Sequence, residues 1–281
     1  IGLDQDRIAP PKNSKNYLKP FWGITKFNLL IWAFDRYVLK GSWTNISIDS
    51  IRENIETGLV WDYDDFNTNA VGHAYHGAMY HSIARSHGMS FLESSIYTFL
   101  GSLSWEFLWE SEFPGKNDHY FSTLGGIHLG EALYRMANLV SYENSTGLRK
   151  TFGKAFKFFV NPIVGITKSS DENLDFGSFG KDHDYDFKLP LGAYHSSDDQ
   201  FIMLIATRFE YKDIFQSNHS KIRPYDWFSF DARIGISDQG FRDPEISTYG
   251  ILFGKKFRNG CAGMFGLFDY INSHMPERMS A

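Results

Sequence analysis

Residues 226–237 read DWFSFDARIGIS, and apolar side chains occupy every second position of this segment. Successive side chains of a β-strand point to opposite faces of its sheet, so this period of two predicts a strand. One face would carry Phe228, Phe230, Ala232, Ile234 and Ile236. The opposite face would carry Trp227, Ser229, Asp231, Arg233, Gly235 and Ser237. The segment therefore predicts a sheet with one apolar and one polar face.

Segments of the same character recur through the second half of the chain. The alternation is clear over residues 201–211, 247–257 and 263–271, and it is less regular over 156–168 and 185–195. The clear segments have about the 9–11 residues that a tilted strand needs to cross a bilayer. Turn signals separate these segments at residues 198–199, 243–244 and 259–260. We therefore predict antiparallel strands from residue 151 to residue 281.

The first half of the chain has a helical period instead. Helical patterns cover residues 21–40, 47–56, 72–87, 90–112 and 122–141, with a polar loop at 61–69 and a helix breaker at 113–118. The sequence thus predicts an α+β protein in three parts. These are an exposed leader (1–20), a helical domain with a buried polar network (21–150), and an antiparallel outer-membrane-type β-barrel (151–281) on which or inside which the helices pack.

Composition narrows the class of protein. The 281 residues include 28 Lys and Arg against 33 Asp and Glu, which gives a formal net charge of −5. This balance argues against a nucleic-acid partner, because such proteins need a basic face to neutralise phosphates. The single Cys excludes an internal disulfide framework and a zinc site built from several Cys. Aromatic residues make up 17% of the chain, which favours closed β structure or a membrane interface.

The two ends of the sequence carry no targeting signal. No secretory signal begins at Ile1, and no apolar run reaches the roughly 20 residues that a transmembrane helix needs. The sequence stops at Ala281, shortly after a strand-like segment. We therefore expect that a signal peptide has been removed and that the barrel of the whole protein is incomplete in this chain.

The predicted helices carry polar residues where a helix bundle normally buries apolar ones. Spacings of three and four place these residues on one face of each helix. They are His73, His76, Tyr80 and Arg85, then Ser102, Glu106 and Glu110, and then His128, Glu131 and Arg135. Gly126 and Gly130 are also four residues apart, and we expect them to let another backbone approach closely.

The interpretation that we favour for this polar set is a buried structural network. A buried charge is tolerated only when it is paired, so acids and bases on these faces must meet if the faces are interior. The network would consist of Arg85, Glu106, Glu110, Glu131 and Arg135.

Two other interpretations give the polar set a chemical role. A metal ion could be held by His73, His76 and Glu106, but the His-Glu-x-x-His string is absent, and we expect no metal and no cofactor. A hydrolase or acyltransferase could use a His base with Ser102 or Ser104 as nucleophile, although no Gly-x-Ser-x-Gly turn is present. The catalytic candidates are His73, His76, Glu106, His128 and Glu131.

An ordered series of motifs runs through residues 61–135. It comprises Trp61-Asp62-x-Asp64-x-Phe66-x-Thr68-Asn69, His73-x-Tyr75-x-Gly77, Ala84-Arg85-x-x-Gly88, Gly101-Ser102-x-x-Trp105-Glu106-x-x-x-Glu110, Asn117-Asp118 and Gly125-Gly126-x-x-x-Gly130-Glu131-x-x-x-Arg135. The series resembles an uncharacterised family of bacterial outer-membrane proteins that is known only as a domain of unknown function. His73-Ala74 stands where that family has His-Pro. The resemblance implies an envelope location and supplies no activity and no catalytic residues.

These observations lead to two hypotheses about function. The first is an outer-membrane β-barrel protein with a structural or accessory role, whose partners are outer-membrane lipid and other outer-membrane proteins or lipoproteins. The second is a lipid- or envelope-processing hydrolase or acyltransferase with a His/Glu site in the helical domain. A barrel in water with its aromatic face turned inward stays open at this point, because alternation does not say which face points outward.

Overall fold

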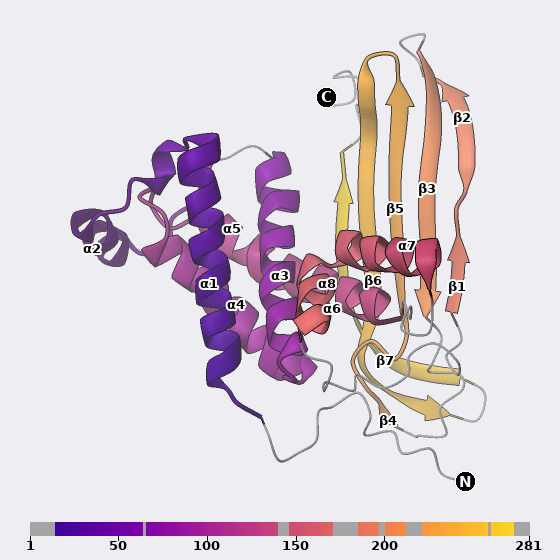
Figure 1. Ribbon diagram of the computed structural model, residues 1–281, viewed down its shortest axis with the longest axis horizontal. Coiled ribbons are helices and arrows are strands. Elements are labelled where there is room, and N and C mark those ends of the chain that lie inside the picture. Colours follow the sequence, from indigo (N-terminus) through magenta and orange to yellow (C-terminus); the bar gives the residue numbers. More distant parts are fainter. Residues whose placement is uncertain are drawn as a thin grey trace. The chain divides into compact units, whose positions relative to one another are not determined.

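The structure, a computed structural model, describes residues 15–63, 66–139, 146–170, 185–196, 200–211, 221–257 and 260–272. The chain divides into two compact units, residues 1–181 and residues 182–281. Helices make up the described part of the first unit, and strands make up that of the second (Figure 1). The predicted α+β class is therefore confirmed.

The described part of the first unit consists mainly of α-helices. They are α1 (Leu18–Phe34), α2 (Ile48–Thr57), α3 (Ala74–Ser86), α4 (Phe91–Leu108), α5 (Lys116–Tyr120), α6 (Gly126–Leu139), α7 (Gly147–Val160) and α8 (Pro162–Ser170). A 3-10 turn, η3 (Ser42–Thr44), precedes α2. Wider π-helical turns extend three helices: η2 (Asp35–Leu39) follows α1, η4 (Thr68–His73) precedes α3, and η5 (Phe121–Gly125) precedes α6. Such widened turns re-aim the side chains they carry and often mark functional positions.

Two helices begin at serine caps that the sequence supplies. The Ser90 hydroxyl accepts a hydrogen bond from the amide of Glu93, and the Glu93 carboxylate accepts one from the amide of Ser90. Ser47 and Ser50 form the same reciprocal pair at the start of α2. These contacts satisfy amides that have no partner within the helix, and they fix where α2 and α4 start.

Glycine lets α3 lie against α6 at very short range. A Cβ atom on Gly77 would lie 1.7 Å from the carbonyl oxygen of Ser122, and one on Gly126 would lie 2.5 Å from the carbonyl carbon of Gly77. A Cβ atom on Gly130 would lie 2.8 Å from the Cβ atom of His81. The close approach predicted at Gly126 and Gly130 is confirmed, and α3 is the element that approaches. Most residues of α3 are buried as a result.

The second unit is one antiparallel sheet. Its strands are β1 (Tyr185–Lys188), β2 (Leu191–His195), β3 (Phe201–Tyr211), β4 (Lys221–Ile222), β5 (Phe228–Ser237), β6 (Gly240–Phe257) and β7 (Gly260–Ile271). Strands β1 and β2 pair with β3, β3 pairs with β5, β5 pairs with β6, and β6 also pairs with β4 and β7. In the part of the chain that the structure describes, no pairing joins β7 to β1 or β2, so this sheet is open and not a closed barrel.

The register confirms the two faces predicted for residues 226–237. Tyr211 pairs with Phe228, and Met203 pairs with Ile236, which sets apolar side chains of β3 and β5 side by side. Arg208 pairs with Asp231 on the opposite face. Directly paired residues share a face of the sheet, so the apolar faces of β3 and β5 coincide.

Residues 156–168 are helical, which corrects the strand predicted there. They belong to α7 and α8, which meet at Asn161. Leu148, Phe152 and Phe156 are spaced by four residues, which is a helical period. Pro162 is the first residue of α8, a position where its missing amide costs nothing.

The predicted domain limits change accordingly. Helix continues to Ser170 instead of ending near residue 150, and the two units divide between residues 181 and 182. The expected leader ends within α1, which begins at Leu18, and residues 1–14 of it lie outside the described residues.

The turn predicted at Asp243-Pro244 is a bulge within β6. Arg233 pairs with Glu245, but Gly235 pairs with Arg242, so the β6 strand carries one extra residue here. Asp243 has a φ of 46°, in the left-handed region, and proline cannot donate to a ladder, so a bulge accommodates both residues. The chain reverses instead at residues 238–239. The turn signal at 198–199 and Asn259 lie outside the described residues.

Candidate functional site

The most deeply buried charges of the helical unit surround Glu131 of α6. Glu131 is fully buried, and its Oε2 lies 3.0 Å from His81 Nε2 and 2.9 Å from Arg85 Nε. Its Oε1 accepts a hydrogen bond from Arg135 Nε at 2.8 Å. Burial acts to raise the pKa of Glu131, but the two guanidinium groups and His81 hold that pKa well below its usual range. The carboxylate is therefore charged, and it ties α3 to α6.

Further contacts hold the groups around Glu131 in place. Arg85 donates from Nη1 to the carbonyl oxygen of Met89 at 2.8 Å and lies 5.0 Å from the centre of the Tyr134 ring. His81 Nδ1 lies 3.4 Å from Thr98 Oγ1. Burial lowers the pKa of His81, so the neutral ring donates its Nε2–H to the carboxylate. This is the arrangement expected of a structural ion cluster, in which two guanidinium groups share one buried carboxylate.

Of the other two acids of the predicted network, Glu106 lies in α4 and Glu110 lies just after its end. Glu106 is buried, and its Oε2 accepts a hydrogen bond from the amide of Gly115 at 2.8 Å. Glu110 is half-buried, and its backbone carbonyl accepts a hydrogen bond from Asn54 Nδ2 at 3.1 Å. Glu106 thus anchors the turn before α5, whereas Arg85, Glu131 and Arg135 meet around one carboxylate.

A second polar cluster, which we call the His73 cluster, comprises His73, Ser122, Asp118, Asn117 and Asp62. His73 Nδ1 lies 3.3 Å from Ser122 Oγ, and His73 Nε2 lies 3.8 Å from Asp118 Oδ1. Asn117 donates to Asp118 Oδ1 at 3.1 Å and accepts from the amide of Asp62 at 2.8 Å. Burial lowers the pKa of His73 to about 4, against an opposing effect of Asp62. The ring is therefore neutral at pH 7 and able to accept a proton.

His76 has a different set of neighbours. Its Nε2 lies 2.9 Å from the Tyr80 hydroxyl oxygen, and that hydroxyl donates to Asn28 Oδ1 at 2.6 Å. The His76 ring meets Trp105 edge-on, with 4.6 Å between the ring centroids. Burial, reinforced by His73, lowers the pKa of His76 to about 3. His76 therefore links α1, α3 and α4 as a neutral ring.

The remaining candidates lie apart from one another. Ser102 Oγ is 3.0 Å from His119 Nδ1, whereas Ser104 Oγ accepts a hydrogen bond from Asn28 Nδ2 at 3.1 Å. His128 is half-buried, and burial followed by the nearby His81 lowers its pKa to about 4. The five catalytic candidates therefore have different hydrogen-bond and ring partners.

The described residues show neither a cluster of metal ligands nor a helix that could span a membrane. Across the described ranges, no group of three or more His, Cys, Asp and Glu side chains is placed to hold a metal ion. No helix among those described combines the length and the apolar character needed to cross a membrane.

Four residues that make these contacts are not among the polar candidates on the predicted helix faces: His81, Asp118, His119 and Ser122. A signal exists for His81, which lies four residues before Arg85 and therefore shares its helix face. Asn117-Asp118 reads as part of a helix breaker, although it also belongs to the motif series. Ser122 has no local signal, because it reaches His73 only through the close packing at Gly77.

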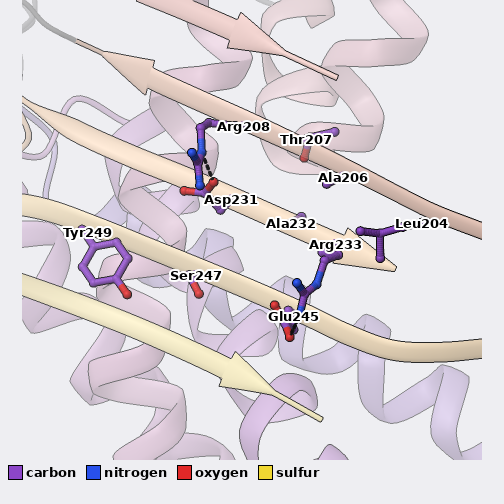
Figure 2. A pocket seen from close by; sticks show the side chains of 10 residues that line it. All are labelled: Leu204, Ala206, Thr207, Arg208, Asp231, Ala232, Arg233, Glu245, Ser247 and Tyr249. Carbon is purple, nitrogen blue, oxygen red and sulfur yellow. Dashed lines mark hydrogen bonds and ion pairs between the residues drawn. The ribbon is translucent and has the colours of Figure 1, made fainter. Parts of the chain in front are cut away.

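The polar face of the sheet forms a hollow lined by charged and small side chains (Figure 2). Arg208 Nε lies 2.5 Å from Asp231 Oδ1, and Arg233 forms an ion pair with Glu245. One register row crosses the sheet through Lys188, Arg208, Asp231, Ser247 and Asp269. Strand β7 departs from this pattern, because Phe265 and Leu267 are exposed on the same face.

Several motif residues thus meet in two places: Asp62, His73, Asn117 and Asp118 belong to the His73 cluster, and Arg85 and Arg135 meet Glu131. Residues 58–163 match the family model of a domain of unknown function, DUF3943. The resemblance to an uncharacterised family is confirmed over this segment. The DUF3943 segment contains α3 to α7 and every catalytic candidate, whereas α1 and the whole sheet lie outside it. No curated protein and no solved structure matches the chain.

Proposed function

We propose that this chain is an outer-membrane protein of the bacterial envelope whose sheet forms part of a β-barrel wall. The apolar face of the sheet would meet acyl chains, and the polar face would line the barrel interior. The observation that carries the proposal is the division of β3 and β5 into an apolar face, part of which is exposed, and an ion-paired polar face.

The apolar face supports the proposal because much of it is exposed. Met203 pairs with Ile236, and Ile205 pairs with both Ile234 and Leu191. Met203 is 56% exposed and Leu191 is 74% exposed. Contiguous apolar side chains of this kind are unfavourable in water, at about 25 cal/mol for each Å² left exposed, and favourable against lipid.

The polar face supports the proposal because its charges are paired between neighbouring strands. Arg208 on β3 meets Asp231 on β5, and Arg233 on β5 meets Glu245 on β6. The interior of a barrel accommodates such groups, whereas a lipid-facing surface does not.

Strand length fits the same location. Strands β3, β5, β6 and β7 have 11, 10, 18 and 12 residues. A tilted strand needs about 9–11 residues to cross the hydrocarbon layer. The described sheet is open, with β1 and β2 at one edge and β7 at the other. Closing it into a barrel would require further strands between these two edges.

A pair of fluorescent probes tests which face meets lipid. In a Cys261→Ser background, Met203→Cys and Ser247→Cys would each be labelled with NBD and reconstituted into vesicles that contain doxyl-labelled lipid. We expect strong quenching by the doxyl groups at residue 203 and by aqueous iodide at residue 247. Iodide quenching at both positions would overturn the proposal, as would a full chain that is monodisperse in buffer without detergent.

A structural or accessory role follows from the same location. The outer rows of the open sheet are the places where strands of this protein or of another outer-membrane protein would pair. Purification from outer membranes in mild detergent, followed by mass spectrometry, would then yield a defined copurifying protein. A single species would argue for a role that needs only lipid as partner.

The His73 cluster favours a second candidate function, an envelope hydrolase or acyltransferase. Ser122, His73 and Asp118 stand in the order of nucleophile, base and carboxylate. Ser122 Oγ would attack an ester carbonyl while His73 takes its proton. The leaving alcohol would then receive that proton, and water or an acceptor alcohol would release the acyl group. Because Ser122 is buried, this candidate requires an opening beside the half-buried ring of His73.

A fluorophosphonate probe tests the second candidate without knowledge of the substrate. It would label Ser122 in the full chain, and His73→Gln would abolish the label. Ser102→Ala is a matched control, since Ser102 contacts a different histidine, His119. A chain that takes up no label at Ser122, although it is folded, excludes this function.

A further inference from the structure

Helix α4 buries small and polar residues and exposes apolar ones, which is the reverse of a helix in a water-soluble bundle. Its buried positions are Ser94, Thr98, Gly101, Ser102, Trp105 and Glu106. Its exposed large apolar positions are Leu92, Ile96, Phe99, Leu100 and Leu108. Leu92 is 70% exposed, although an amphipathic helix in water buries such residues.

Helix α1 and the π-helical turn after it have the same inverted character. The buried positions of α1 are Pro20, Ile24 and Asn28. Exposed side chains include Leu18, Phe21, Trp22, Leu29, Leu30, Phe34, Tyr37 and Val38. Two helices that share this inversion leave apolar surface far beyond the isolated exposed residues of an ordinary protein.

Polar contacts hold α1 to α4, so the two apolar surfaces belong to one assembly. Asn28 Nδ2 donates to Ser104 Oγ at 3.1 Å, and the Tyr97 hydroxyl donates to the carbonyl oxygen of Tyr17 at 2.5 Å. Lys15 Nζ lies 2.7 Å from Glu93 Oε2 just before α1 begins. Asn28 and Ser104 therefore face inward because that is where their partners are.

The charges around this surface favour a partner with anionic groups. No charged residue lies between Glu93 and Glu106, so the exposed side of α4 is neutral. Residues 18–40 carry the basic side chains Lys19, Lys26, Arg36 and Lys40 against a single acid, Asp35. A basic segment within a chain of net charge −5 complements anionic headgroups.

Aromatic side chains at both ends of this segment point to the same occupant. Tyr17 and Trp22 are exposed at the start of α1, and Tyr37 is exposed just after its end. Tyr and Trp collect where acyl chains meet headgroups, because one end of each ring system is apolar and the other is polar.

We propose that α1 and α4 form a membrane-interface surface that lies along a bilayer containing anionic lipid. Helix α4 has 18 residues and is therefore about 27 Å long, but it is not apolar enough to span. A helix of this type lies in the plane of the interface with its apolar side among the acyl chains. The proposal does not rest on the barrel wall, because it concerns the other unit.

Probes on the helical unit test this proposal. In the Cys261→Ser background, Leu100→Cys and Glu53→Cys would be labelled with NBD in the full chain and reconstituted with phosphatidylcholine and phosphatidylglycerol. Glu53 is exposed on α2 and serves as the matched control. We expect doxyl lipids to quench the probe at residue 100 at least about 2-fold more than the probe at residue 53. Combining Lys19→Glu with Lys26→Glu should reduce the quenching at residue 100 to its level in phosphatidylcholine alone.

Other occupants of the surface would give different results. Iodide quenching at residue 100, equal to that at residue 53, would mean a water-exposed surface and would overturn the proposal. A probe that neither quencher reaches, together with bismaleimide cross-linking of two Leu100→Cys chains, would mean that a second copy covers the helices, which also overturns it. The Met203→Cys probe separates the two proposals. Doxyl quenching at residue 100 without quenching at residue 203 would support the membrane-interface surface and contradict the barrel wall.

Discussion

The helical unit and the sheet separate polar from apolar side chains in different ways. The helices turn polar groups inward, where Glu131 is fully buried, and leave apolar residues of α1 and α4 exposed. The sheet assigns the two kinds of side chain to opposite faces, and its charges keep contact with solvent. A charge on the sheet can therefore lose its partner and be hydrated, whereas a charge inside the helices cannot.

Burial and not distance distinguishes the ion pairs of the two units. Arg135 lies 2.8 Å from Glu131, and both side chains are buried, at 7% and 0% exposure. Arg208 lies 2.5 Å from Asp231, yet these side chains are 65% and 32% exposed. Pairs of similar length should therefore contribute very differently to stability, and substitutions in each unit measure the difference.

Removing the charge of Glu131 should have the largest effect. Glu131→Gln leaves Arg85 and Arg135 buried without their common counter-charge, so we expect the free energy of unfolding to fall by about 3–5 kcal/mol. Urea denaturation in detergent, followed by tryptophan fluorescence, would measure the loss. The control is Glu56→Gln, whose pair with Arg52 is exposed and should contribute less than about 1 kcal/mol. Equal losses for the two variants would contradict the contrast between the units.

Adding one methyl group where α3 meets α6 should have the next largest effect. A Cβ atom on Gly77 would lie 1.7 Å from the backbone oxygen of Ser122, so Gly77→Ala forces the helices apart. We expect a loss of about 2–3 kcal/mol, which is typical of overpacking. Gly72→Ala is the control, because no atom lies within 4 Å of its added methyl group. A tolerated Gly77→Ala, measured by the same denaturation, would mean that the buried network does not depend on this contact.

The sequence predicts the sheet better than the polar clusters, for a physical reason. Strand β3 begins and ends at the predicted residues 201 and 211, because a period of two identifies a strand and its faces from local order alone. Helical spacing likewise puts Glu106 and Glu131 on one face of their own helices. The spacing does not say which other helix each face meets. It therefore places Glu106 and Glu131 in one network, although Glu106 contacts the amide of Gly115.

The other errors also arise where tertiary structure decides. The strand predicted over 156–168 and the turn predicted at 243–244 both lie where the local pattern has two solutions, resolved as α7 with α8 and as a bulge in β6. Ser122 reaches His73 only because glycine lets two backbones meet. None of these outcomes is encoded in the spacing of a single segment.

Acid should weaken the helical unit through its buried histidines. Burial holds the pKa of His73 at about 4 and that of His76 at about 3 in the folded state, against about 6.5 when unfolded. The unfolded chain therefore binds more protons between those values, so stability is fully present above pH 6.5 and falls as the pH drops toward 4. Each histidine contributes up to about 1.4 kcal/mol per pH unit in this window.

Denaturation midpoints at pH 7.5 and pH 5.5 would measure the acid effect. His73→Gln should flatten the dependence, because glutamine has no proton to gain. The matched control is His195→Gln, which replaces an exposed histidine at the end of β2. A wild-type chain whose midpoint is the same at both values would contradict the buried, neutral state of the histidines.

The smallest effect should come from breaking an ion pair on the polar face of the sheet. Arg208→Gln removes a pair with Asp231 that water already reaches, so we expect a loss below about 1 kcal/mol that shrinks further at high salt. Arg208→Lys keeps the charge and should lose less. Denaturation midpoints at low and high salt would measure both variants. If the loss for Arg208→Gln approached that for Glu131→Gln and did not respond to salt, the polar face would be shielded from water, and the two units would hold their charges in the same way.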